Sequence, residues 1–221
     1  MRKLKIPDNL TTRAYNTIKE HILDGRLDED SRLTEGSLSS RLGISKSPIR
    51  EALNRLEAEG LVRIEPRKGA YLRRLSMSEM NELYDLREAL EVHVVRTAKV
   101  TPALLSELWQ SVKRQRALLK ANDKPHYIEE DVHFHAELAR STENGPLCTV
   151  LQNTQNQIWL CRRNTYDLSG STAPDYHQSI VRALEDNDRA RAQEIMREHI
   201  VNVRRGLLQF MEDQEGRQKV G

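Results

Sequence analysis

Three histidines and one aspartate are the side chains whose types and spacing suggest a chemical site. Asp131 and His135 lie four residues apart in a predicted helix, so their side chains are neighbours on one face. His177 and His199 lie on the apolar faces of two further predicted helices. One carboxylate and three imidazoles suit a divalent ion such as Zn²⁺, Ni²⁺ or Mn²⁺. The pattern predicts a metal site where these helices converge in a helical core.

The same residues also allow a purely structural interpretation. A single histidine on an apolar helix face is commonly a hydrogen-bonded core residue. An aspartate four residues from a histidine can simply accept a hydrogen bond from it. Three such positions in one region favour the metal, but the spacing alone leaves both interpretations open. His133 lies two residues from Asp131 and faces another direction, so we do not expect it to be a ligand.

Arg87 is a second polar residue on an apolar helix face, between Leu83 and Leu90. A buried guanidinium needs a partner, because an isolated buried charge is strongly destabilising. One possibility is an ion pair, for example with Glu91 one helical turn away. The other is a clamp for the carboxylate of a bound ligand, since guanidinium binds carboxylates through two parallel hydrogen bonds.

A different kind of pattern occupies residues 33–72. Two short helices are predicted at 35–41 and 46–60, and Gly43 allows the sharp connection between them. Two strands follow, at 61–64 and 70–72, separated by a turn with adjacent cations. A short helix, a tight turn, a second helix and a β-hairpin form a winged helix-turn-helix.

The exposed face of the second helix and the turn of the wing carry groups that bind phosphates and base edges. The candidate DNA-binding residues are Ser45, Lys46, Ser47, Arg50, Asn54, Arg67, Lys68 and Gly69. The alternative is a helical hairpin whose charges are merely solvated. Helix order, turn, polar face and wing all agree with nucleic-acid binding.

The remaining pattern is helical, so the predicted fold is mainly α, with an N-terminal winged helix-turn-helix and a C-terminal all-α bundle. A first helix is expected from Thr11 or Thr12 to Asp24. The bundle helices are expected at 78–99, 102–121, 125–141, 145–166, 174–186 and 188–213. We therefore expect two domains, 1–75 for DNA binding and 76–221 for effector binding and dimerisation.

Charge and composition fit this division. Residues 1–75 carry 16 Lys and Arg against 11 Asp and Glu, whereas the remainder carries 19 against 22, which suits a nucleic-acid module joined to a different one. No apolar run approaches the roughly 20 residues that span a bilayer, and no secretory signal is evident. Cys148 and Cys161 do not make a disulfide framework. We therefore expect a cytoplasmic protein with no membrane partner.

Residues 33–72 resemble the winged helix-turn-helix of GntR-type bacterial transcription regulators. The resemblance rests on Leu33-Thr34-Glu35, Leu42-Gly43-Ile44-Ser45, Ser47-Pro48-Ile49-Arg50-Glu51-Ala52-Leu53, Leu56, Glu59-Gly60-Leu61-Val62 and Gly69-Ala70. It implies that Ser45, Lys46, Arg50 and Gly69 contact DNA. Gly36 departs from the pattern, because the family often has a DNA-contacting arginine there.

The remainder resembles the FCD effector domain of the FadR subgroup of these regulators. The resemblance rests on Asp131-Val132-His133-Phe134-His135, on the segment that begins at His177, and on Met196-Arg197-Glu198-His199-Ile200. It implies a divalent metal held by Asp131, His135, His177 and His199, and a small carboxylate effector near Arg87 and Asn144. It also implies a homodimer on a palindromic operator.

Three functions remain in view. The first is a ligand-responsive transcription regulator, with repression the favoured sign. The second is a metalloenzyme fused to a DNA-binding module, although no motif with a paired base and nucleophile appears. The third is a metal sensor in which the ion itself is the signal. We expect no enzymatic activity.

Overall fold

A computed structural model of the chain describes residues 10–24, 26–27, 32–162 and 172–218. The chain divides into two compact units, Met1–Arg74 and Leu75–Gly221. Within the described residues, no helix is both long and apolar enough to cross a membrane.

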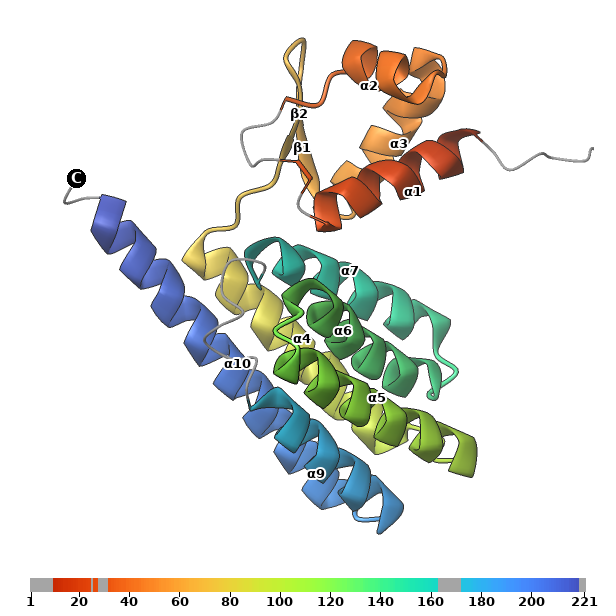
Figure 1. The fold of residues 1–221 in the computed structure, drawn as a ribbon, viewed down its shortest axis with the longest axis vertical. Helices are drawn as coiled ribbons and strands as arrows, with labels where there is room; N and C mark the ends of the chain where they lie inside the picture. Colours follow the sequence, from red (N-terminus) through yellow and green to blue (C-terminus); the bar gives the residue numbers. More distant parts are fainter. Residues whose placement is uncertain (1–9, 25, 28–31, 163–171, 219–221) are drawn as a thin grey trace, which may run out of the picture. The chain divides into compact units, whose positions relative to one another are not determined.

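The N-terminal unit is a winged helix-turn-helix (Figure 1). Its elements are α1 (Leu10–Leu23), α2 (Glu35–Leu42), α3 (Lys46–Ala58), β1 (Val62–Glu65) and β2 (Gly69–Leu72). The two strands pair antiparallel, and Leu33 adds an isolated bridge to Ala70 beside them. Helices α1 and α2 both pack on α3, so the apolar faces of three helices close one small core.

Glycine sets the sharp turn that orients α3. Gly43 adopts a left-handed conformation, with φ of 66°, and its N–H donates to the carbonyl oxygen of Ser39. This is a helix end that a residue with a Cβ enters only at some strain. The chain then turns directly into α3, whose N-cap is Ser45. The apolar stripe predicted for α3 is buried, with Ile49 and Leu56 each 0% exposed.

One local prediction in this unit, the start of the first helix, needs correction. The first helix begins at Leu10, so neither Thr11 nor Thr12 caps it. The Thr11 hydroxyl instead donates to Glu51 of α3, at 2.8 Å, and ties the two helices together. Ser45 occupies the cap position of α3, but its side chain makes no capping hydrogen bond.

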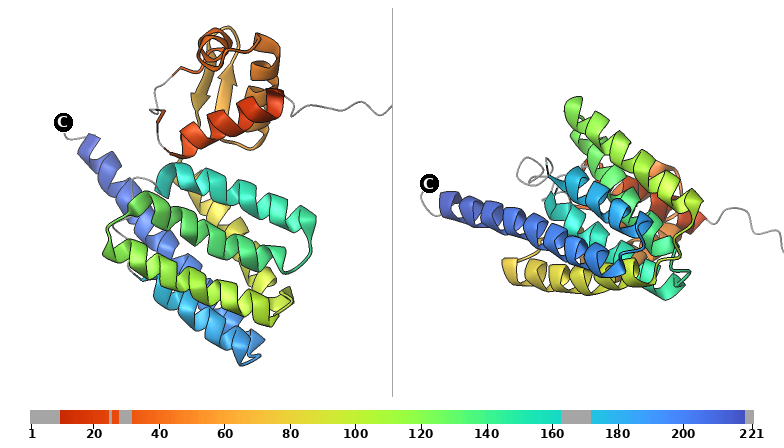
Figure 2. Two further views of the ribbon diagram at one scale, coloured as in Figure 1. Left: turned by 45° about the vertical axis from the view of Figure 1, so that its right-hand side comes forward. Right: turned by 90° about the horizontal axis from the view of Figure 1, so that it is seen from below.

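The C-terminal unit is an all-α bundle (Figure 1). Its helices are α4 (Met77–Thr97), α5 (Pro102–Lys120), α6 (Lys124–Arg140), α7 (Gly145–Arg162), α9 (Ala173–Glu185) and α10 (Arg189–Gln218). Helix α10 runs along α4 and α9, α5 lies beside α6 and α9, and α7 packs on α4 and α6 (Figures 1 and 2). The mainly α fold with a two-stranded wing is the one that the sequence predicts.

Helix boundaries in the bundle follow local signals. Ser76 and Glu79 form a reciprocal capping box at the start of α4, and Thr101 caps α5 just before Pro102. Helix α10 continues to Gln218, beyond the predicted end at 213. The predicted extension of α7 over 163–166 lies outside the described residues.

Candidate metal and effector site and candidate DNA-binding surface

Three helices of the bundle bring the four predicted metal ligands together. Helix α6 supplies Asp131 and His135, α9 supplies His177 and α10 supplies His199. One ligand atom from each residue lies within 4.8 Å of the others, and none of the four side chains is more than 1% exposed. His177 Nε2 lies 3.2 Å from His199 Nε2 and 3.8 Å from Asp131 Oδ1. The cluster is therefore compact and shielded from solvent.

Helix α5 orients His177. The Nδ1 atom of His177 lies 2.7 Å from Gln115 Oε1, and Gln115 Nε2 in turn donates to Ser111 Oγ at 3.2 Å. Because the amide oxygen can only accept, the proton of His177 sits on Nδ1 and the lone pair on Nε2 points into the cluster. Burial, followed by nearby His135, lowers the pKa of His177 to about 3. The ring is neutral, as a metal ligand must be.

His199 faces His177 across the cluster. Burial and the neighbouring His177 hold the pKa of His199 well below its usual range, so this ring is neutral too. Its Nδ1 is buried and has no hydrogen-bond partner among the described residues. Two metal–nitrogen bonds of about 2.0–2.1 Å, meeting at about 90–109°, would separate their nitrogens by about 2.8–3.4 Å. The observed 3.2 Å between the two Nε2 atoms fits a shared ion.

His135 has a different environment, because both its ring nitrogens meet charged groups. Its Nδ1 pairs with the Glu91 carboxylate, and its Nε2 lies 3.0 Å from Arg87 Nη2. The carboxylate on Nδ1 is the partner that orients many metal-binding histidines. The Nε2 lone pair, however, accepts a hydrogen bond from Arg87. His135 can ligate a metal through Nε2 only if Arg87 releases this contact.

Arg87 and Glu91 form the ion pair that the sequence allows. Arg87 Nε donates to Glu91 Oε1 at 2.6 Å, and both side chains are 2% exposed. Burial alone would raise the pKa of Glu91, but electrostatic attraction and hydrogen bonds from His135 and Arg87 outweigh it and lower the pKa to about 2. Glu91 therefore stays ionised and ties α4 to the cluster. The sequence suggested it as a partner of Arg87 but not as a contact of His135.

A small cavity opens beside this cluster. Its volume is about 10 Å³, the room of roughly one water molecule. Its lining consists of Arg87, Asp131, Val132, Gln155, Ile158 and Trp159. Guanidinium, carboxylate and amide groups thus meet apolar walls in a space for about one water, so a larger ligand enters only if these side chains move apart.

Gln155 is a candidate that the sequence prediction missed. It is 5% exposed, lines the cavity, and its Nε2 has no hydrogen-bond partner among the described residues. An unpartnered buried amide is destabilising by about 1–3 kcal/mol and often marks a ligand or water position. Residues 152–156 are all polar, so the sequence does not show that three of them, Thr154, Gln155 and Asn156, are buried.

Asn144 does not join this cavity. It is exposed before α7, and its Oδ1 accepts a hydrogen bond from the backbone N–H of Leu147 at 3.1 Å. This is a helix-capping contact. Its position gives no support to the predicted effector contact, and Gln155 supplies an amide at the cavity instead.

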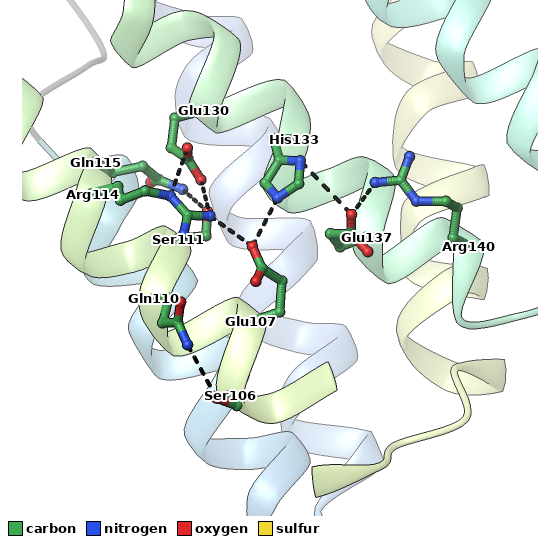
Figure 3. A network of polar contacts seen from close by, with 10 residues as sticks. All are labelled: Ser106, Glu107, Gln110, Ser111, Arg114, Gln115, Glu130, His133, Glu137 and Arg140. Atoms are coloured by element: carbon green, nitrogen blue, oxygen red, sulfur yellow. Dashed lines mark hydrogen bonds and ion pairs between the residues drawn. The ribbon is translucent and has the colours of Figure 1, made fainter. Parts of the chain in front are cut away.

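His133 lies outside the cluster, on the surface between α5 and α6. Its Nε2 lies 2.9 Å from Glu107, and its Nδ1 lies 3.8 Å from Glu137 (Figure 3). Arg114 bridges Glu107 and Glu130 in the same network. The contacts of His133 with Glu107 and of Arg114 with Glu130 link α5 to α6.

The candidate DNA-binding residues of α3 are all exposed. They are Ser45, Lys46, Ser47, Arg50 and Asn54. Their shared face lies opposite the buried stripe of α3. Arg50 is also engaged within the protein, because its Nε and Nη2 donate to the two carboxylate oxygens of Glu35, at 2.6 and 2.7 Å. The sequence prediction did not include this pair.

The wing presents Arg67 and Lys68 as exposed side chains at its turn. Gly69 follows with φ of 118°, and a Cβ there would lie 3.0 Å from the backbone oxygen of Leu33. Glycine is therefore required here by the fold, because Leu33 approaches to pair with Ala70 through two hydrogen bonds of 2.8 Å. Gly69 lets two cations project from a tight hairpin.

An N-terminal winged helix-turn-helix followed by a helical bundle with a buried polar cluster defines a two-part class of DNA-binding regulator. Comparison with known families agrees. Residues 10–72 match the bacterial regulatory proteins of the gntR family, and residues 82–202 match the FCD domain. The chain therefore belongs to the GntR-family transcription regulators with an FCD domain, which confirms that part of the prediction.

Individual relatives are similar over most of their length. The HTH-type transcriptional repressor RspR of Escherichia coli (strain K12) is 23% identical over 205 residues, 90% of this chain and 89% of the relative. The gluconate operon transcriptional repressor of Bacillus subtilis (strain 168) is 27% identical over 187 residues, 80% of this chain and 76% of the relative. These relatives are named as regulators and not as enzymes.

Solved structures share the fold. E. coli McbR/YncC has a TM-score of 0.82 at 20% identity, and the match covers 93% of this chain and 100% of that one. The putative transcriptional regulator GntR from Rhodococcus sp. RHA1 has a TM-score of 0.79 at 22% identity, and the match covers 90% of this chain and 97% of that one. At such identities the likeness concerns architecture alone.

Proposed function

We propose that this chain is a ligand-responsive repressor that binds a palindromic operator as a homodimer. Its bundle holds one divalent metal through Asp131, His135, His177 and His199. A small organic acid binds beside the metal and weakens operator binding. The observation that carries the proposal is the convergence of four buried ligand side chains next to a cavity lined by Arg87.

The donor set supports a resident divalent ion. Two neutral imidazoles face each other through Nε2 at 3.2 Å, and a carboxylate stands near them. Gln115 and Glu91 fix two of the three rings from outside the cluster. A bound ion would supply a Lewis-acid anchor for an oxygen atom of the effector. This donor set suits Zn²⁺, Ni²⁺ or Mn²⁺ and does not choose among them.

Arg87 and Gln155 support a carboxylate effector. Arg87 offers guanidinium N–H groups at the cavity, and Gln155 offers an amide N–H without a protein partner among the described residues. If His135 binds the metal through Nε2, Arg87 loses that nitrogen as a hydrogen-bond acceptor and needs another one. A carboxylate oxygen accepts a stronger hydrogen bond from guanidinium than an imidazole nitrogen does. One relative is named for a gluconate operon, so a sugar acid belongs among the acids to be tested.

The operator would be contacted through α3 and the wing. Lys46 and Arg50 on α3, with Arg67 and Lys68 in the wing, supply cations for phosphates and base edges. A dimer would present two such helices to two half-sites at a fixed spacing. Helix α4, which carries Arg87, begins at Met77, shortly after β2 ends at Leu72. A shift of α4 on effector binding would therefore reach the DNA-binding unit through residues 73–76.

Operator release tests the proposal. The full chain is first used to select its binding site from random-sequence DNA. Affinity for that site is then measured with and without a panel of organic acids, gluconate included, before and after treatment with a chelator. We expect at least one acid to weaken binding about 5- to 150-fold, the usual range of allosteric coupling, and chelation to abolish that response.

Two results would contradict the proposal. If the metal alone released the operator and no acid added to its effect, the chain would be a metal sensor, the alternative considered from the sequence. If acids acted equally on chelated protein, the cluster would have no part in sensing them. Selection of no site at all would remove the DNA-binding function itself.

A further inference from the structure

Glu35 is an acidic residue at the edge of the face that carries the candidate DNA contacts. Its two carboxylate oxygens accept hydrogen bonds from Nε and Nη2 of Arg50, at 2.6 and 2.7 Å. The pair joins the first residue of α2 to the exposed face of α3. A carboxylate here opposes binding to DNA, because it repels the phosphates that Lys46 and Arg50 attract.

The position of Glu35 is fixed by the start of α2. Thr34 is the N-cap, and its side chain accepts a hydrogen bond from the N–H of Ser37. Glu35 is the acidic residue of the first turn, where the helix dipole favours a negative charge. Arg50 and, more weakly, Lys46 hold the pKa of Glu35 below its usual value, so the carboxylate is ionised. The start of α2 therefore fixes the position of the Glu35 carboxylate.

The contacts of Arg50 use one particular side of its guanidinium. A guanidinium can present two parallel N–H groups side-on, from Nε and one Nη, or end-on, from Nη1 and Nη2. Glu35 engages the side-on pair. The end-on pair is the one left for the O6 and N7 acceptors of a guanine, which arginine binds through two parallel hydrogen bonds.

We propose that Glu35 is a specificity-determining residue for DNA recognition. It holds the Arg50 side chain in one orientation. Arg50 then donates two hydrogen bonds, from Nη1 and Nη2, to a guanine edge instead of turning toward the nearest phosphate. This inference rests on the proposed role of α3 in operator binding. Glu35 lowers general DNA affinity through its charge and raises the preference for the correct sequence through Arg50.

The test compares two DNA molecules and three variants in the full chain. Wild-type protein selects its site from random-sequence DNA, and affinities are measured for that site and for an unrelated duplex of equal length. Glu35→Ala removes the anchor. Glu35→Gln keeps an acceptor of similar shape without the charge. Glu20→Ala is the charge-matched control, because Glu20 is an exposed acid of α1 in the same unit.

We expect Glu35→Ala to bind the unrelated duplex roughly two- to fivefold more tightly, because a phosphate-repelling charge is gone. The ratio of specific to unrelated affinity should fall about 10-fold, within the range of one bidentate base contact. Glu35→Gln should keep part of that ratio. Glu20→Ala should leave the ratio unchanged.

An unchanged ratio in Glu35→Ala would overturn the inference, as would equal effects of Glu35→Ala and Glu20→Ala. The failure of the proposed function looks different: wild-type protein would then select no site, or Arg50→Ala would bind the selected site as wild type does. Circular dichroism of each variant, compared with wild type, confirms that any loss of ratio comes from a folded protein.

Discussion

Two arginine–glutamate pairs in this chain share one contact but differ in burial. In both, the arginine Nε lies 2.6 Å from a glutamate Oε1. The side chains of Arg50 and Glu35 are 62% and 30% exposed, whereas those of Arg87 and Glu91 are 2% and 2% exposed. The same Nε–Oε1 hydrogen bond therefore occurs once at the solvent-exposed surface and once in a helical core.

The difference in environment separates what the two pairs can do. Water competes for the exposed pair, so it contributes little to stability and can be exchanged for a nucleic-acid contact. The buried pair has no such substitute, and removing one member leaves the other charge desolvated. Contact geometry alone would assign both pairs the same role. Burial makes the Arg87 pair part of the core, whereas solvent exposure allows the Arg50 pair the role in DNA recognition that we propose.

Breaking the buried pair should give the largest effect. Arg87→Met leaves the buried Glu91 without its arginine partner, so we expect a loss of about 3–5 kcal/mol in the free energy of unfolding. Thermal and urea denaturation of the full chain measure it. The double variant Arg87→Met/Glu91→Leu should regain much of the loss, because no unpaired charge remains. A single variant as stable as wild type would contradict the buried-pair assignment.

Removing the metal should give the second-largest effect. Protein purified without chelator should contain close to one divalent ion per chain by elemental analysis, and His177→Ala should lose most of it. At a free metal concentration 100 times its dissociation constant, the ion stabilises the fold by about 2.7 kcal/mol. His133→Ala is the matched control, because this nearby histidine of α6 lies in the surface network of Figure 3. Equal metal loss in both variants would contradict the assigned ligands.

Sequence patterns predicted this cluster because helical periodicity carries the information. Asp131 and His135 are one turn apart, and His177 and His199 each sit on an apolar stripe, so burial followed from the elements themselves. Arg87 and Glu91 could be paired for the same reason. How the helices then meet around the cluster is a matter of packing, which the FCD resemblance supplied and spacing did not.

Contacts between distant elements escaped prediction. Glu35 and Arg50 are 15 positions apart on two helices, and their pairing depends on how α2 crosses α3. Gln155 lies in a polar run of α7 whose solvated and buried members look alike in sequence. Asn144 was assigned through the resemblance, yet its local geometry makes it a helix cap. Helical periodicity therefore predicted which residues share a helix face, but it did not predict how two helices cross.

Arg50→Ala should weaken operator binding roughly 10- to 100-fold, because it removes the proposed bidentate contact to a base edge. The protein should remain folded, since Arg50 is exposed. Affinity should also fall steeply with salt, by about 0.9 log units per phosphate contact and per log unit of salt. Fluorescence anisotropy on the selected site measures both. Arg13→Ala, on the exposed part of α1, serves as a charge-matched control.

Gln155→Leu should weaken the response to the effector about 10-fold while leaving metal content and operator affinity unchanged. The amide donor would be lost from the cavity, but no metal ligand and no DNA contact is touched. Stability should stay level or rise, because the change removes a buried amide nitrogen that has no partner among the described residues. The response is measured by titrating the effector against operator-bound protein, with Gln152→Leu as the control variant. An unchanged response would exclude Gln155 from the effector site.

Breaking the exposed pair should have the smallest effect on the fold. In Glu35→Ala, Arg50 loses its partner but remains solvated, so no charge is left buried and no core contact changes. Hydrogen exchange of the α3 amides in the full chain should keep its wild-type protection, and the unfolding midpoint should move by less than about 2 °C. Arg87→Met is the comparison in the core, because it removes the matching Nε–Oε1 contact from the buried pair together with the contact of Arg87 to His135. If Glu35→Ala lowered protection throughout α2 and α3, the exposed pair would be a structural link between the helices, and the contrast between the two pairs would fail.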